Sequence, residues 1–191
     1  MLPVILKLVK ERGHKVFTRG DFNLNIVGVR NLDSTQSNDF DDLITCTYKD
    51  NGKWITKSWT ATTDPGTHYL HNPMRVEGTA ILCPGQYRSV YKIDGHGVTR
   101  YEALCQRLGK VKVYRDSNKD DILDYNSPTQ EGYFGINIHR AHSKYRREEV
   151  NKYSAGCQVF ADPADFAEFM SLVHKSADIY GNKFTYTLIE L

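Results

Sequence analysis

The chain has 191 residues, of which 40% are hydrophobic and 25% are charged, and its formal net charge is +2. This composition excludes an intrinsically disordered protein, and a chain of this length buries enough surface to fold without disulfide bonds. So small a net charge gives no support to a nucleic-acid partner, and we expect none.

The first residues are expected to carry neither a membrane span nor a secretory signal. The early apolar run from Val4 to Leu6 stops at Lys7, and Lys10 follows soon after. This run is too short to cross a bilayer, and no small-residue cleavage site follows it. We therefore expect no membrane span, and a site of action outside the cytoplasm would require another route of delivery.

A short helix is predicted at the N-terminus. Pro3 is followed by apolar residues at Ile5, Leu8 and Val9, and Gly13 ends the pattern. Proline is favoured in the first turn of a helix and glycine just beyond its end. We treat residues 1–21 as an N-terminal helical extension and 22–191 as the main domain.

From residue 22 onward, alternating runs predict a β-rich domain. The first strand lies within 22–30, and runs 42–50 and 53–62 form a hairpin because Asn51 and Gly52 both tolerate positive φ. Further strands are predicted at GTAILC (78–83), QYRSVYKI (86–93), KVKVYRD (110–116) and GYFGINIH (132–139). The segment YEALCQRLG, 101–109, predicts a helical turn instead.

The C-terminal part is predicted as a helix followed by a strand. Asp162 and Pro163 are typical of a helix cap and first turn, and apolar residues recur at helical spacing from Phe166 to Val173. The segment 183–191 predicts a final strand. The fold class is therefore mainly β with a few helices.

Three of the four cysteines are predicted to be small buried hydrophobic residues: Cys46, Cys83 and Cys105. No pair has the spacing of a zinc site. Cys157 differs, because Gly156 precedes it and a turn-like Tyr-Ser-Ala leads into it.

Cys157 and His139 each lie next to the end of an apolar run, which suits a nucleophile and its base. A cysteine attacks a carbonyl as the thiolate, and a nearby imidazole can take its proton and hold the ion pair. Gly156 would let backbone N–H groups point at a developing oxyanion. The alternative is that neither side chain has a chemical role.

The segment between these two residues is positively charged. It contains five basic and two acidic residues: Arg140, Lys144, Arg146, Arg147, Lys152, Glu148 and Glu149. Such a segment favours an acidic or carboxylate-bearing substrate, or else it is an ordinary solvated surface. His142 is in turn a candidate proton carrier or substrate contact, or a surface histidine.

His139 together with Ser154-Ala155-Gly156-Cys157 resembles the signature of the L,D-transpeptidase (YkuD-type) catalytic domain. That family has a histidine, a spacer of the length seen here, and the cysteine of a Ser/Thr-His-Gly-Cys turn. The resemblance covers Gly132 to the C-terminus and extends back to Phe22.

The resemblance implies a role for each matching residue. Cys157 would be the nucleophile, His139 its base, and the backbone amides of Gly156 and Cys157 the oxyanion donors. The carbonyl of Arg140 would orient the imidazole, and Ser154 would buttress the turn. Substrate contacts are assigned to Ser154, Ala155 and His142. The implied fold is a β-sandwich of mixed sheets with a helix after the nucleophile.

Two residues depart from the family pattern. Ala155 replaces the histidine of the turn, and Val159 stands where arginine or asparagine is usual. Gln158 does not replace that side chain, because strand alternation points it to the other face. The base and the nucleophile of the family are kept, but some of the side chains that position its substrate are replaced. This variant of the motif is most similar to phage-type members of the family.

The resemblance implies a cysteine-dependent acyl-transfer enzyme that acts on peptidoglycan stem peptides at the cell envelope, by cross-linking or by L,D-peptide hydrolysis. One alternative is a catalytically silent cell-wall-binding or virion-structural module of the same fold. Another is a thiol peptidase that acts on unrelated peptides.

No cofactor is expected to be required, but one loop has the spacing of a calcium site. Asp116, Asn118, Asp120 and Asp124 occupy positions 1, 3, 5 and 9 of this loop. Asp121 replaces the usual glycine of such loops, so the alternative is an acidic solvated turn. A bound Ca²⁺ would be structural.

Overall fold

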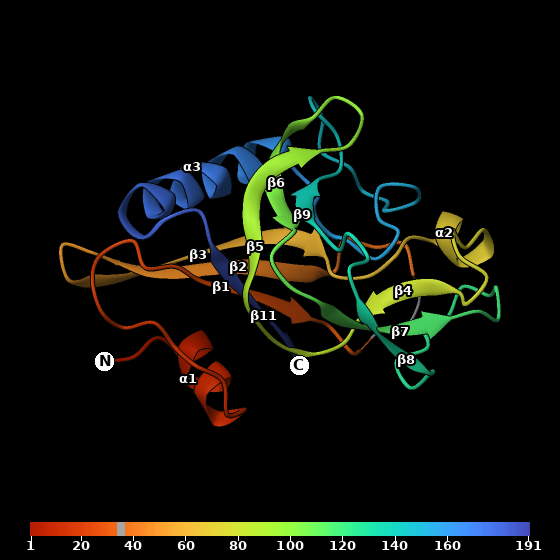
Figure 1. Cartoon of the computed structure of the whole chain (residues 1–191), viewed down its shortest axis with the longest axis horizontal. Coiled ribbons are helices and arrows are strands. Elements are labelled where there is room, and N and C mark those ends of the chain that lie inside the picture. Colours follow the sequence, from red (N-terminus) through yellow and green to blue (C-terminus); the bar gives the residue numbers. More distant parts are fainter. Residues whose placement is uncertain (34–36) are drawn as a thin grey trace.

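The computed structural model describes residues 1–33 and 37–191, and these form a mainly β fold with three helices (Figure 1). The helices are α1 (Val4–Glu11), α2 (Thr67–His71) and α3 (Pro163–Tyr180). The strands are β1 (Asn25–Arg30), β2 (Asp42–Asp50), β3 (Lys53–Thr62), β4 (Thr79–Leu82), β5 (Gly85–His96), β6 (Tyr101–Gln106), β7 (Val111–Asp116), β8 (Thr129–Gly132), β9 (Ile138–Arg140), β10 (Gln158–Phe160) and β11 (Phe184–Glu190).

Eight strands close a barrel in the order β1-β11-β5-β6-β9-β10-β3-β2, and the other three form a sheet in the order β4-β7-β8. The barrel is mixed, because β1 runs parallel to β11 and β9 runs parallel to β10. The expectation of a mainly β fold is confirmed. The β-sandwich is not specifically confirmed, because the larger sheet closes on itself.

The predicted hairpin and the C-terminal elements are confirmed. Asn51 and Gly52 have φ values of 47° and 74°, the left-handed values that a tight turn between β2 and β3 requires. The Asp162 side chain caps α3 by accepting a hydrogen bond of 2.8 Å from the Ala164 amide. β11 then pairs with both β1 and β5.

The helical turn predicted around Cys105 is wrong. This segment is strand β6, which pairs antiparallel with β5 from Tyr91 opposite Gln106 to His96 opposite Tyr101. Helix-forming residues such as Ala103 and Leu104 are completely buried there. Pairing with a neighbouring strand thus overrides a weak local helix preference.

The strand predicted over 132–139 is also shorter than expected. Only Ile138–Arg140 forms β9, since Gly135 has a φ of 72° that breaks the extended backbone before it. The irregular stretch from Tyr133 to Asn137 leaves backbone groups free to contact other parts of the chain. This matters for the site, because Gly135 and Asn137 both contact Cys157.

Two helices pack against the barrel at different places. The buried face of α3 joins the main core, where Phe166 and Phe169 pack on Phe160 of β10. The shorter α1 packs through Val9 on Val27 and Ile189 of β1 and β11. The domain boundary at residue 22 stays a prediction. In the described ranges, no helix combines the length and apolar character needed to cross a membrane.

Candidate active site

The turn before β10 presents Cys157 to a cavity. Gly156 has a φ of 115°, and a Cβ at this position would collide with the carbonyl oxygen of Ala80. Only glycine combines this conformation with so close an approach of two backbones. The Cys157 side chain is partly exposed, whereas the other cysteines are buried, as predicted, and all four are free thiols.

Ser154 holds this turn through two hydrogen bonds. Its hydroxyl accepts from the Gly156 amide at 3.1 Å and donates to the Cys157 carbonyl at 2.8 Å. The Gly156 amide is therefore occupied within the turn, which differs from its expected role as an oxyanion donor. Within the described residues, the Cys157 amide donates no hydrogen bond and is the free donor at this position.

Replacing Ser154 with alanine is expected to lower the free energy of unfolding by about 1–3 kcal/mol, since a buried amide loses its acceptor. Urea denaturation of the variant measures the effect. The exposed Ser171 on α3 supplies the control, because Ser171→Ala removes a hydroxyl without a buried partner. Equal effects of the two substitutions would contradict the role of Ser154.

His139 and Cys157 project toward the same face of the barrel. His139 pairs with Val159 across the parallel strands β9 and β10, and Cys157 precedes Val159 by two residues. Because side chains alternate along a strand, Cys157 and Val159 share one face. Gln158 lies on the other face, fully buried, where its side chain bonds Tyr186 and the Thr63 carbonyl.

The thiol is held by backbone groups and not by the imidazole. The Cys157 sulfur donates to the Gly135 carbonyl and accepts from the Asn137 amide, each at 3.4 Å. In the described part of the chain, no hydrogen bond joins this sulfur to His139. The sulfur must leave these backbone contacts before the imidazole can take its proton.

The imidazole of His139 has a defined tautomer. Its Nδ1 lies 2.9 Å from the Arg140 carbonyl, which can only accept, so Nδ1 carries the proton. Nε2 is then unprotonated and can act as a base. This is the contact that the family resemblance implied for Arg140. The Tyr101 hydroxyl also donates to the Arg140 carbonyl at 3.4 Å.

A second histidine, His96, belongs to the site and was not assigned from the sequence. Its ring stacks on His139 with centroids 4.1 Å apart and planes 22° from parallel. The Asn137 side-chain amide lies 3.0 Å from its Nδ1. Only the pairing of β5 with β6 brings His96 here, so no local pattern could have found it.

Both reacting groups are neutral in this structure. Burial, together with the charge of His96, lowers the pKa of His139 from 6.5 to about 3. Burial raises the pKa of the Cys157 thiol to about 11. A resting thiolate–imidazolium pair, which the sequence analysis expected, is therefore disfavoured at neutral pH. An attack by this sulfur on a carbonyl would require transfer of the thiol proton in the same step.

The low pKa of His139 predicts that acid destabilises the protein. Below pH 6.5 the unfolded chain takes up a proton that the folded chain resists until about pH 3. The free energy of unfolding should therefore fall as the pH drops through this range, by at most about 1.4 kcal/mol per pH unit. Urea denaturation between these limits should show a smaller fall for His139→Gln. An identical pH dependence of stability in the wild-type protein and in His139→Gln would contradict the lowered pKa of His139.

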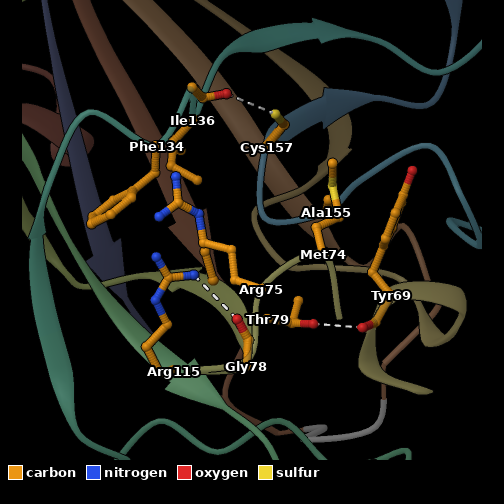
Figure 2. Close-up of a pocket in the computed structure, with 12 residues that line it drawn as sticks. Tyr69, Met74, Arg75, Gly78, Thr79, Arg115, Phe134, Ile136, Ala155 and Cys157 are labelled. Carbon is orange, nitrogen blue, oxygen red and sulfur yellow. Dashed lines mark hydrogen bonds between the residues drawn. The ribbon is translucent and has the colours of Figure 1, made fainter. Parts of the chain in front are cut away.

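The cavity at Cys157 has a volume of about 330 Å³ (Figure 2). Ala155 also lines it, while Ser154 is fully buried beneath the turn. His142 does not line it, and its Nδ1 accepts from the amides of Lys144 and Tyr145. Of the predicted site residues, the structure thus places Cys157 and Ala155 at this cavity, whereas His139, Arg140, Gly156 and His142 are not among the residues that line it.

The charged segment before Cys157 lines a different hollow. Residues of the range 146–149, with Lys152, surround this second hollow together with His68. Basic and acidic side chains both line it, and Cys157 is not among its walls. This segment does not line the Cys157 cavity, so its charge gives no support there to the expected preference for a carboxylate.

Two other basic residues, Arg75 and Arg115, line the Cys157 cavity together with Phe134. Sequence reasoning missed them, although a signal exists for Arg115. It continues the alternate positions of Val111 and Val113, whose side chains are buried, so period-two spacing places a cation on the inner face of β7. Charged side chains are rarely buried without a partner, so a charged residue on the buried face of a strand indicates a functional role.

The loop at 116–124 is closed by its own hydrogen bonds. The Asn118 side-chain amide donates to carboxylate oxygens of Asp120 and Asp124, and the Asp124 amide donates to Asp116. Across residues 1–33 and 37–191, no group of three or more His, Cys, Asp or Glu side chains is placed to hold a metal ion. Calcium binding stays a prediction.

No protein-family model, curated protein or solved structure matches this chain. The function is therefore argued from the site itself and from the motif resemblance.

Proposed function

We propose that the protein is a cysteine-dependent acyl-transfer enzyme of the L,D-transpeptidase type that acts on peptidoglycan stem peptides at the cell envelope. The proposal rests on the placement of Cys157 directly before β10, two residues from Val159, which pairs with His139 of β9. The Arg140 carbonyl supports it by keeping Nε2 of His139 unprotonated. The cavity supplies space for a peptide beside the sulfur.

The proposed reaction begins with attack of the Cys157 sulfur on the carbonyl at the L side of an L,D-peptide bond. The thiol proton moves to Nε2 of His139 as the S–C bond forms. The free Cys157 amide can donate to the developing oxyanion. The C–N bond then breaks, the His139 proton passes to the leaving amine, and a thioester remains.

The second half of the reaction releases the acyl group. An acceptor amine or a water molecule attacks the thioester, and its proton passes through His139 to the departing sulfur. An amine gives a cross-link, and water gives a hydrolysed peptide. Both outcomes restore the neutral thiol and imidazole, which are the forms that burial favours.

Two observations favour a second candidate, a catalytically silent cell-wall-binding or virion-structural module. The pKa of the Cys157 thiol is raised, which reduces its reactivity, and the sulfur bonds backbone groups instead of His139. Ala155 and Val159, which replace substrate-positioning residues of the family, also favour a silent module. A module of this kind would bind stem peptides without forming a covalent intermediate.

Incubation with purified muropeptides tests the two candidates. The enzyme is expected to gain the mass of an acyl donor that has lost its D-residue, with the addition located on Cys157, and to release cross-linked or shortened peptides. Intact-mass analysis should also detect an adduct with a carbapenem, which the family resemblance implies. A protein that keeps its original mass with every donor would be the silent module.

A further inference from the structure

The walls of the Cys157 cavity carry positive charge without an acidic partner. Arg75, from the segment between α2 and β4, and Arg115, from β7, both line it (Figure 2). In the part of the chain that the structure describes, no aspartate or glutamate belongs to these walls. An anionic ligand would therefore meet two cations and no opposing charge.

Arg115 is the more constrained of the two, since it is only 5% exposed. Its Nε donates to the Gln130 side chain at 2.9 Å, and one terminal nitrogen donates to the Gly78 carbonyl at 3.2 Å. The other terminal nitrogen, Nη2, is enclosed and has no hydrogen-bond partner among the described residues. A buried cationic donor without an acceptor is costly, so this nitrogen needs a ligand.

The two guanidinium groups lie beside the same aromatic ring. Their central carbons are 4.6 Å (Arg115) and 5.8 Å (Arg75) from the centroid of Phe134, and Figure 2 shows one group above the other next to that ring. Burial and the charge of Arg75 both lower the pKa of Arg115, while the exposed Glu77 opposes this only weakly. Like charges held together in this way favour an anion between or beside them.

We propose that Arg75 and Arg115 bind a carboxylate of the acyl donor and so position the donor beside the Cys157 sulfur. A guanidinium matches a carboxylate with two parallel hydrogen bonds. Because the sulfur and both arginines share one cavity, the carboxylate and the reacting bond belong to one ligand. The inference rests on the proposed function.

The carboxylate has two chemical sources in a stem tetrapeptide: the terminal carboxylate of the leaving residue and the side-chain carboxylate of the acyl residue. Calorimetric titration of the Cys157→Ala protein with three tetrapeptides separates them. One has both groups free, one has the terminal group as an amide, and one has the side-chain group as an amide. Blocking the recognised group should weaken binding by about 10- to 100-fold, the loss of a charge-assisted hydrogen bond.

Substitutions in the same Cys157→Ala protein assign the effect to the arginines. Arg75→Gln alters an exposed side chain, so it should not affect folding. Arg115→Lys keeps the positive charge but loses the planar guanidinium that can donate two parallel hydrogen bonds. Both should bind the free tetrapeptide about 10-fold or more weakly and discriminate less between the three forms. Lys112→Gln removes an equal charge from the exposed side of β7 and is the matched control.

Equal binding of all three tetrapeptides by the parent protein would overturn the carboxylate site, as would arginine variants that behave like Lys112→Gln. These titrations use protein without the nucleophile, so they do not depend on thioester formation. A carboxylate preference without any thioester in the wild-type protein would leave this site standing and reject only the proposed acyl transfer.

Discussion

Replacing Cys157 with alanine is expected to abolish thioester formation and to lower acyl-transfer activity by on the order of 10⁴-fold or more, because no other group can take the place of the nucleophile. The side chain is partly exposed at the cavity, so its loss should leave the fold intact. The measurement is product analysis by mass spectrometry after incubation with muropeptides, together with the intact mass of the protein.

A matched control removes a thiol that has no access to substrate. Cys46 is completely buried in β2, and Cys46→Ala also replaces one sulfur with a hydrogen. This control should keep its activity, although a small cavity in the core lowers its stability by about 1 kcal/mol. Turnover that survives in Cys157→Ala would exclude covalent catalysis at this position.

Replacing His139 with glutamine is expected to lower the rate of thioester formation by about 10²- to 10⁴-fold, the usual contribution of a general base. Because the pKa of Cys157 is near 11, the thiol is almost entirely protonated at neutral pH and needs the imidazole at the moment of attack. Single-turnover measurements of adduct formation isolate this step from release of the acyl group.

The pH dependence of the variant provides a second readout. Without a base, thioester formation should depend on the thiolate and rise about tenfold per pH unit until the pH nears the thiol pKa. The wild-type rate should depend much less on pH above the low pKa of His139. His174→Gln, an exposed residue of α3 that bonds Glu102, is the control. A His139→Gln protein with the wild-type rate and profile would rule out this base.

The same burial that keeps His139 uncharged also keeps Cys157 protonated, so we expect the free protein to react slowly with electrophiles in general. Substrate that fills the cavity and displaces the sulfur from the Gly135 carbonyl would start the reaction. Under the proposed function, reactivity of the thiol would therefore depend on binding of the substrate.

Predictions from the sequence succeeded where a few adjacent residues determine the structure. Asn51 and Gly52 define their hairpin because both accept positive φ, and Asp162 defines the start of α3 because its side chain caps the first turn. The segment around Cys105 failed for the opposite reason. Its local preference is weak, and pairing with β5 decides its conformation.

Local residues alone determined that this chain folds as a mainly β protein and that a histidine and a cysteine each lie next to the end of an apolar run, at a spacing that suits a base and its nucleophile. Only the tertiary structure decided that the barrel closes, that His96 stacks on His139, and that Arg75 and Arg115 share a cavity with Cys157. The physical reason is that turn and cap preferences act over a few residues. Burial, charge proximity and pKa depend on groups that lie far apart in the chain and meet only after folding.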